Sequence, residues 1–142
     1  MNNFTAHGWQ SVLPANWTDR SMITLVGATG ASGIAANIVV TREEVDRRTS
    51  VEDYAEAQKQ AMSAEIGTLH ILDERAIKLN DKPAFQRLQR FEIERMTFQQ
   101  AQTFVLGRNE IFVITGTAAV EDFNDLIGAI REFTENFRLT NG

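Results

Sequence analysis

A glycine-rich loop between two strand-like segments constrains this chain more than any other feature. In residues 21–44, the seven residues GATGASG separate the runs SMITLV and NIVVT. A strand, a tight glycine turn and a following helix would form the phosphate cradle of a dinucleotide-binding enzyme. Two strands joined by the same glycines would instead form an antiparallel hairpin. The choice decides whether an enzyme is expected.

The residues behind the loop favour the hairpin. Ile38, Val39, Val40 and Thr41 follow one another, and β-branched residues favour strands over helices. The loop therefore lacks a helix N-terminus for a pyrophosphate, and no second strand–helix unit follows it. A glycine fingerprint alone is weak evidence for a nucleotide site. We expect GATGASG to be a mobile tip whose glycines contact nothing specific, and we expect no bound cofactor.

Two segments carry helical periodicity. Ser50, with Asp53 three residues later, forms a weak capping pair at the start of a helix over residues 51–66, which Gly67 ends. A second helix, over about residues 119–137, has the strongest helical spacing in the chain. Its apolar positions are Phe123, Leu126, Ile127, Ile130, Phe133 or Thr134, and Phe137. Burying such side chains contributes about 2 kcal/mol each before entropy, so this helix is expected on the core.

Strands account for most of the remaining chain. The expected segments are residues 4–12, 21–26, 37–41, 70–79, 84–95, 96–106 and 110–115. A charged connection is expected over residues 42–48, and a slip in the alternation of residues 84–95 suggests a bulge. The order is strands, helix, about four strands, helix. This order indicates an α+β fold in one domain over residues 1–142, with a mainly antiparallel sheet of about six or seven strands and two principal helices.

Composition and charge argue against several kinds of site. The 142 residues carry a net charge of −5, and no basic run is interleaved with aromatic residues, so nucleic-acid binding is disfavoured. The absence of cysteine excludes disulfides, thiolate metal sites and cysteine nucleophiles. His7 and His70 lack partners at ligand spacing, so no metal site is expected. No spacing of Ser, His and Asp marks a nucleophile, and we expect no enzyme.

Targeting signals are also missing from the sequence. The first ten residues contain no basic segment followed by an apolar run, and no transmembrane stretch follows. We therefore expect a cytoplasmic protein without direct membrane insertion. A mature fragment of an exported protein would show the same pattern.

Three glutamines interrupt faces that are otherwise apolar. Gln58 lies in the helix over residues 51–66, and Gln100 and Gln102 share one face of the strand over residues 96–106. They are either partly exposed or internally satisfied amides, or they line a groove in which amides bond the polar groups of an apolar peptide. Met favours such a groove because it repacks around different ligands. The residues alone leave both interpretations open.

Several segments together resemble one known family. The resemblance is carried by four segments: NIVVTREEV, TSVEDYAEAQ, QRFEIERMTFQQAQTFVL and FNDLIGAIREF. The chain is similar to the DcrB-like domain of the PsbP-like superfold, and more narrowly to the Eag adaptor chaperones of bacterial type VI secretion. The resemblance covers about residues 4–137, and NIVVTRE and QQAQTFVL are its most specific parts. It implies a PsbP-like α/β sandwich that forms a homodimer with a concave apolar surface. It also implies a chaperone that shields the N-terminal transmembrane helices of a membrane-inserting toxin effector and helps to load that effector on the secretion spike.

The same resemblance implies where the effector helices would bind. The groove would consist of Met22, Thr24, Val39, Gln58, Met62, Ile66, Phe98, Gln100 and Gln102. Thr24 departs from the family pattern, in which an aliphatic residue is expected. An apolar helix gains free energy by burial, and small residues on its surface let chaperone amides approach its backbone.

Two alternatives belong to other classes of protein. The first is a DcrB-like or PsbP-like domain that acts in an envelope or as a protein-binding module of other function. The second is a nucleotide-dependent oxidoreductase, in which GATGASG would hold the cofactor. Secretion genes beside this one would favour the chaperone, and a flat thermal-shift response to NAD(P)(H) would remove the oxidoreductase.

Overall fold

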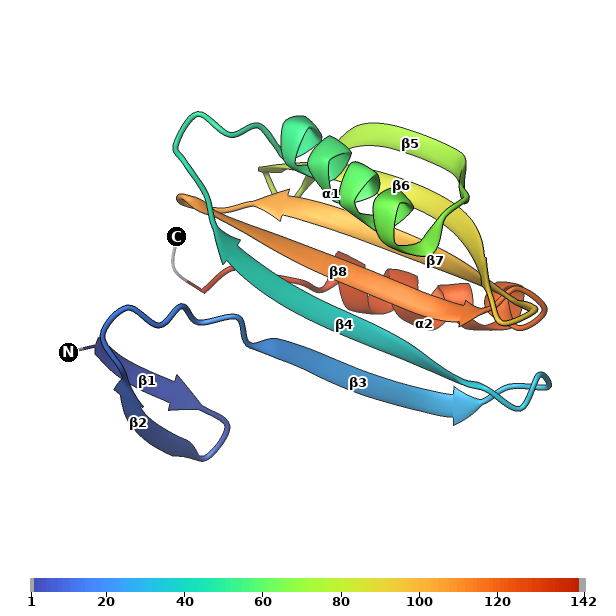
Figure 1. Ribbon diagram of the computed structural model, residues 1–142, viewed down its shortest axis with the longest axis horizontal. Coiled ribbons are helices and arrows are strands. Elements are labelled where there is room, and N and C mark those ends of the chain that lie inside the picture. Colours follow the sequence, from blue (N-terminus) through green and yellow to red (C-terminus); the bar gives the residue numbers. More distant parts are fainter. Residues whose placement is uncertain (1, 141–142) are drawn as a thin grey trace.

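Eight strands and two helices make up the computed structural model, which describes residues 2–140 (Figure 1). The strands are β1 (Asn2–Ala6), β2 (Trp9–Leu13), β3 (Met22–Thr29), β4 (Ala35–Glu44), β5 (Leu69–Leu79), β6 (Lys82–Ile93), β7 (Met96–Leu106) and β8 (Glu110–Ala119). The helices are α1 (Val51–Ile66) and α2 (Phe123–Glu135). The chain order is four strands, a helix, four strands and a helix, and this confirms the predicted α+β class.

One antiparallel sheet organises the molecule. Its strand order is β3-β4-β8-β7-β6-β5, while β1 and β2 form a separate two-stranded hairpin. Sequential hairpins make every connection in the sheet except the pairing of β4 with β8, which matches Asn37 with Thr117 and Glu44 with Glu110. This one non-sequential ladder joins the β3–β4 hairpin to the β5–β8 meander.

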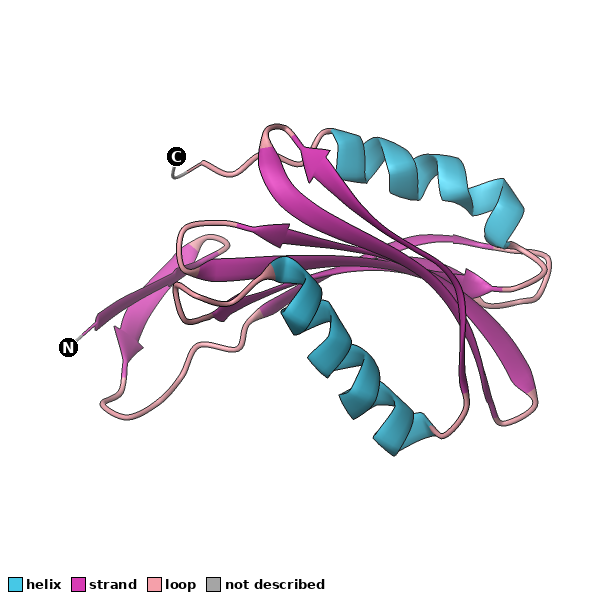
Figure 2. Cartoon of the chain, turned by 90° about the horizontal axis from the view of Figure 1, so that it is seen from above, coloured by secondary structure: helices cyan, strands magenta, loops and turns pink. Residues whose placement is uncertain are grey.

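The helices lie on opposite faces of this sheet (Figure 2). α1 packs mainly on β5, β6 and β7, and we call the face that it partly covers the α1 face. α2 packs on β8 and β7 from the other side, which we call the α2 face. The core on the α1 face contains Val51, Ala55, Phe104, Ile111 and Val113. The core on the α2 face contains Ala36, Ala118, Phe123 and Ile130.

The predicted bounds of α1 are confirmed at both ends. The Ser50 hydroxyl oxygen accepts a hydrogen bond from the backbone N–H of Asp53 at 3.0 Å, and this satisfies one of the free donors of the first turn. Gly67 follows the last turn, and its N–H donates to the carbonyl of Ser63 at 3.0 Å. Local capping chemistry therefore sets the two ends of this helix.

The predicted start of α2 is wrong by four residues because β8 is longer than expected. Gly116 was expected to end the strand, yet β8 continues to Ala119. A Cβ at Gly116 would lie 2.6 Å from Cδ1 of Ile130, so the missing side chain is what lets α2 approach the sheet. The glycine therefore serves helix packing in the strand interior and does not stop the strand.

Three other segments also differ from the expectations. Residues 4–12 contain a turn at His7 and Gly8 and so form the β1–β2 hairpin in place of one strand. The charged residues that follow Thr41 continue β4 as far as Glu44. The irregularity expected within residues 84–95 lies on the partner strand β5, as a register shift between Ile71 and Asp73.

The glycine-rich segment is part strand and part turn. β3 extends through Gly27 to Thr29, and β4 resumes at Ala35, so an antiparallel hairpin is confirmed and no helix follows the loop. The expectation that its glycines contact nothing specific is wrong, because Gly30 lies against the side chain of Asp122.

Substitutions at two glycines test the packing of α2, with opposite expected signs. Gly116→Ala should lower the free energy of unfolding by about 1–3 kcal/mol, because the new methyl group overlaps Ile130. Gly128→Ala should raise it by about 1 kcal/mol, because the site is open and alanine favours the helix. Urea denaturation of both variants measures the two changes, and shifts of the same sign would contradict this packing.

Candidate binding surface on the α1 face

A polar and apolar surface is left uncovered beside α1. Because α1 packs mainly on β5, β6 and β7, it covers β8 only as far as Val113 and leaves the α1 face of β3, β4 and the adjoining parts of β8 and β7 partly uncovered (Figure 1). We call this part of the α1 face the open shelf. It consists of Met22, Thr24, Val26, Asn37, Val39, Thr41, Gln100, Gln102, Thr115 and Thr117. Side chains in a sheet alternate between faces, so strand register brings these residues to one side.

Strand pairing arranges the shelf in rows across the sheet. One row contains Thr24, Val39, Thr115, Gln102 and Arg87. The next row contains Val26, Asn37, Thr117, Gln100 and Gln89. Met22 and Thr41 belong to a third row that leads into the buried Phe104. The predicted residues Met22, Thr24, Val39, Gln100 and Gln102 are therefore brought together on the shelf.

The glutamines on β7 take part in a chain of hydrogen bonds. Nε2 of Gln89 donates to Oε1 of Gln100 at 2.7 Å, and Nε2 of Gln100 donates to Oγ1 of Thr117 at 2.9 Å. In the neighbouring row, Nε2 of Gln102 donates to Oγ1 of Thr115 at 3.4 Å. Gln100 is thus satisfied within the fold, whereas the hydrogen bond of Gln102 is longer.

The other predicted residues lie outside the shelf, at different places. Met62 lies above the amide chain, with Sδ 3.4 Å from Nε2 of Gln89. Gln58 is exposed and lines a hollow of about 790 Å³ that also contains Met22, between α1 and the β1–β2 hairpin. Phe98 stacks on Phe91 at a ring distance of 5.8 Å. Ile66 lines a separate hollow with Phe91, at the end of the helix farthest from Gln58.

The outer strand of the shelf is the most exposed apolar element of the fold. All eight residues of β3 are exposed, and none of them carries a charge. On the shelf side, Met22 is 61% and Val26 is 71% exposed. On the α2 face of the same strand, Ile23 is 43% and Leu25 is 44% exposed. Contiguous exposed apolar surface of this kind marks interaction sites.

A buried arginine holds α1 on the sheet beside the shelf. Arg87 is 2% exposed, and its Nε lies 3.0 Å from Oε2 of Glu74 on β5. Its Nη2 donates to the carbonyl of Ala55 in α1 at 2.7 Å, and its guanidinium lies 5.4 Å from the ring centroid of Phe104. The charge is therefore paired and hydrogen-bonded, as a buried arginine requires. It fixes the helix that forms one wall of the shelf.

The single tyrosine lies where α1 meets the end of β4. The hydroxyl of Tyr54 donates to Oε2 of Glu43 at 3.1 Å. Burial, followed by the nearby Glu43 charge and this hydrogen bond, raises the pKa of Tyr54 to about 12. Tyr54 and Glu43 also line the hollow that contains Gln58, so this end of the shelf is polar.

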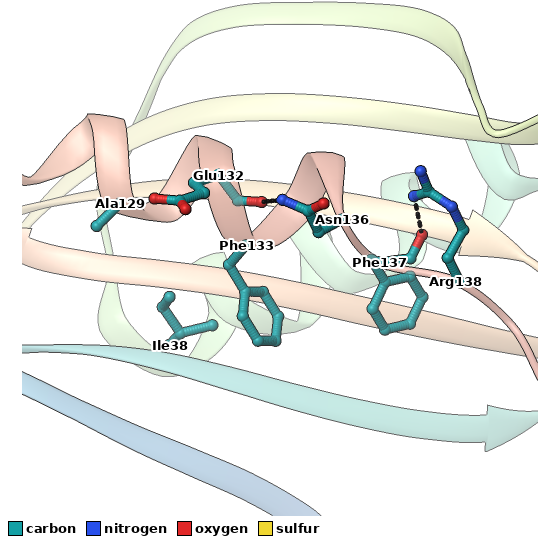
Figure 3. Close-up of a pocket in the computed structure, with 7 residues that line it drawn as sticks. All are labelled: Ile38, Ala129, Glu132, Phe133, Asn136, Phe137 and Arg138. Carbon is teal, nitrogen blue, oxygen red and sulfur yellow. Dashed lines mark hydrogen bonds between the residues drawn. The ribbon is translucent and has the colours of Figure 1, made fainter.

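A second apolar hollow lies on the other face. It has a volume of about 540 Å³ and is formed where the last turns of α2 pass over β4. Figure 3 shows the rings of Phe133 and Phe137 projecting from α2 toward β4, where Ile38 lies. This hollow is separated from the open shelf by the thickness of the sheet.

Residues 2–140 also bear on membrane spanning and metal binding. Within that range no helix is long and apolar enough to cross a membrane. In the same part of the chain, no group of three or more His, Asp or Glu side chains is arranged to hold a metal ion.

Five shelf residues were not predicted from the sequence. Thr115 is the last residue of the expected strand, and Thr117 lies beyond it. Val26 and Asn37 flank the glycine loop, and Thr41 is the last residue of the strand expected over residues 37–41. The alternation of Thr115, Gly116 and Thr117 is a period-two signal that continues the strand and that would have found the two threonines.

Comparisons with known proteins agree with this architecture. The sequence model of the DcrB family matches residues 11–133. A Pseudomonas aeruginosa protein of unknown function, PA94, which has been proposed as a regulator, superposes with a TM-score of 0.84 and 15% identity over 100% of this chain and 99% of that chain. Among curated proteins, none matches the sequence.

Two further solved structures share the fold. The PsbP protein of the cyanobacterium Synechocystis sp. PCC 6803 superposes with a TM-score of 0.61 and 11% identity, over 97% of this chain and 91% of that chain. LpqN of Mycobacterium tuberculosis, described as involved in cell envelope biogenesis, gives 0.58 and 12% identity over 85% of each chain. The predicted PsbP-like α/β sandwich is confirmed, and at these identities the likeness concerns the fold alone.

Titration of Tyr54 tests the geometry at the end of the shelf. An unfolded tyrosine ionises near pH 10, whereas the folded one has a pKa of about 12. The stability that Tyr54 contributes should therefore be complete below about pH 10 and lost as the pH rises through about 12. Because the chain has one Tyr, tyrosinate absorbance reports this group alone. Glu43→Gln should lower the midpoint, and a midpoint near 10 in both proteins would contradict the contact.

Proposed function

Because the chain belongs to the DcrB family, whose sequence model covers most of it, we propose that it is a non-catalytic binding protein whose open shelf holds an apolar helix. The observation that carries this proposal is the exposure of β3, an edge strand whose eight residues are all exposed and uncharged. Met22 and Val26 expose apolar surface on the shelf side of this strand. An apolar ligand would remove that surface from water.

The composition of the shelf suits a helix better than an extended apolar chain. Apolar side chains lie along β3 and at Val39, while the hydroxyls of Thr115 and Thr117 and the amide of Gln102 lie toward β7. A helix with small residues on one side brings its backbone close to such groups. Its large apolar side chains would then lie on β3 and α1.

The narrower proposal is an Eag-type adaptor chaperone acting in the cytoplasm. Its ligand would be the N-terminal transmembrane helices of a type VI secretion effector, which need shielding from water before export. The segments NIVVTRE and QQAQTFVL support this choice, because NIVVTRE lies in β4 and QQAQTFVL is the part of β7 that carries the shelf amides Gln100 and Gln102. The bound effector would then be loaded on the secretion spike.

We also propose that two copies pair along β3. The opposite edge strand, β5, carries Asp73, Glu74, Arg75 and Lys78, which discourage pairing with another chain, whereas β3 has no charge. Pairing of two β3 strands would cover both edges and join two open shelves into one floor between two α1 helices. Sedimentation equilibrium should give twice the mass of one chain, and a monomer would contradict this pairing.

Charge substitutions on the two faces of β3 test the binding proposal. Met22→Asp and Val26→Asp should each weaken binding of an apolar transmembrane helix about tenfold or more, because each removes one buried apolar contact. Ile23→Asp and Leu25→Asp are matched controls on the α2 face of the same strand and should have little effect. Co-purification with the transmembrane N-terminus of an effector encoded beside this gene, followed by competition with unlabelled helix, measures the difference.

The controls also separate helix binding from self-association. Asp on either face places a charge on the same β3 edge, so the difference between faces reports the shelf. Equal losses for all four variants would contradict the assignment of the site. Binding of folded soluble proteins without binding of apolar helices would favour a DcrB-like or PsbP-like module of other function. Thermal stabilisation by NAD(P)(H) would favour the oxidoreductase.

A further inference from the structure

The loop that ends the β3–β4 hairpin is held by its own hydrogen bonds. The N–H of Gly33 donates to the carbonyl of Gly30 at 3.0 Å, and the N–H of Gly30 donates to the carbonyl of Ile34 at 3.2 Å. The N–H of Ile34 donates to Oγ of Ser32 at 3.2 Å. These bonds place the hydroxyl of Ser32 and the backbone of Gly30 in one compact turn.

The carboxylate of Asp122 occupies this turn. Asp122 is 3% exposed and lies 90 residues away in sequence, directly before α2. Its Oδ2 accepts a hydrogen bond from Oγ of Ser32 at 2.5 Å, and both its oxygens lie 3.4 Å from the backbone nitrogen of Ser32. The side chain makes no capping hydrogen bond to its own helix. The carboxylate of Asp122 therefore accepts its hydrogen bonds from the loop and not from the first turn of α2.

Gly30 gives this carboxylate its space. A Cβ at Gly30 would lie 2.3 Å from both Cγ and Oδ2 of Asp122, a separation that real atoms do not reach. Any larger residue would have to displace the carboxylate. By contrast, a Cβ at Gly27, in the same glycine-rich segment, would meet only ordinary contacts, the shortest being 3.6 Å to the carbonyl oxygen of Ala36.

We propose that the anion bound by the glycine-rich loop is the chain's own Asp122, and that this contact positions the β3–β4 hairpin as the outer wall of the open shelf. β3 pairs with β4 alone, so the ladder between β4 and β8 holds the hairpin along its length. The loop and the start of α2 lie at the same end of the molecule, where this ladder has ended (Figure 1). The contact of Asp122 with Ser32 is a further attachment, and it fixes the end of the hairpin where the loop joins β3 to β4.

The predicted effect of Asp122 on helix binding rests on the proposed function, whereas its effect on the β3–β4 hairpin does not. Asp122 and Ser32 lie at the loop and not among the shelf residues, so Asp122 acts as a positioning residue through β3. A positioning role predicts a local change in β3 and β4, whereas a general loss of stability would affect the whole sheet.

Hydrogen exchange of Ser32→Ala, Asp122→Ala and the double variant tests the contact. Each single variant should lower the protection of amides in β3 and β4 about tenfold. The double variant should lose little more protection, because the two single substitutions remove the same interaction. Protection in β5 and β6 should be unchanged. Ser32→Thr, which keeps the hydroxyl, should restore most of the protection.

The two glycines supply a steric version of the same test. Gly30→Ala should reproduce the loss seen in Ser32→Ala, and Gly27→Ala should retain the wild-type exchange pattern in β4. Unchanged protection in Ser32→Ala, a uniform loss over all strands, or additive losses in the double variant would each overturn the proposal.

Binding of an apolar transmembrane helix separates this proposal from the function on which it rests. If the wild-type protein binds the helix, Ser32→Ala should bind it about tenfold more weakly, in line with its exchange. Equal binding despite faster exchange would overturn the positioning role. If the wild-type protein does not bind the helix, the proposed chaperone function is contradicted. The contact between Ser32 and Asp122 is then tested by the hydrogen-exchange data alone.

Discussion

The antiparallel pairing of β4 with β8 is the contact on which the rest of the structure depends. It joins the β3–β4 hairpin to the β5–β8 meander by pairing residues that lie about half of the chain apart in sequence. It also sets the register that brings Val39 beside Thr115 and so creates one continuous α1 face. A shift by one residue would exchange the two faces of the hairpin and place Ile38 and Val40 on the shelf.

Short-range sequence patterns predicted the features of the fold that depend on neighbouring residues. The ends of α1 follow from Ser50 and Gly67, and period-two alternation placed the predicted β7 residues on one face. The start of α2 was missed because Gly116 is required by Ile130, which lies on another element. The contact of Ser32 with Asp122 could not be predicted, since it joins residues 90 positions apart and depends on the whole topology.

The glycine-rich loop illustrates how one sequence pattern can serve two different purposes. In a dinucleotide enzyme, such a loop leads into a helix whose N-terminus faces a phosphate. Here β4 follows the loop, and the negative group beside Ser32 comes from Asp122. The same lack of a following helix leaves β3 and β4 uncovered on the α1 face. The feature that disfavours a cofactor thus also produces the open shelf.

The position of a bound apolar helix on the α1 face can be measured most directly with single labels on β3. The chain has no cysteine, so Thr24→Cys and Leu25→Cys each give one site for an environment-sensitive fluorophore, on opposite faces of the strand. If the open shelf binds an apolar helix, as we propose, addition of a transmembrane helix should move the label at position 24 into an apolar environment and leave the label at position 25 unchanged. A response at position 25 alone, or equal responses at both positions, would contradict binding on the open shelf.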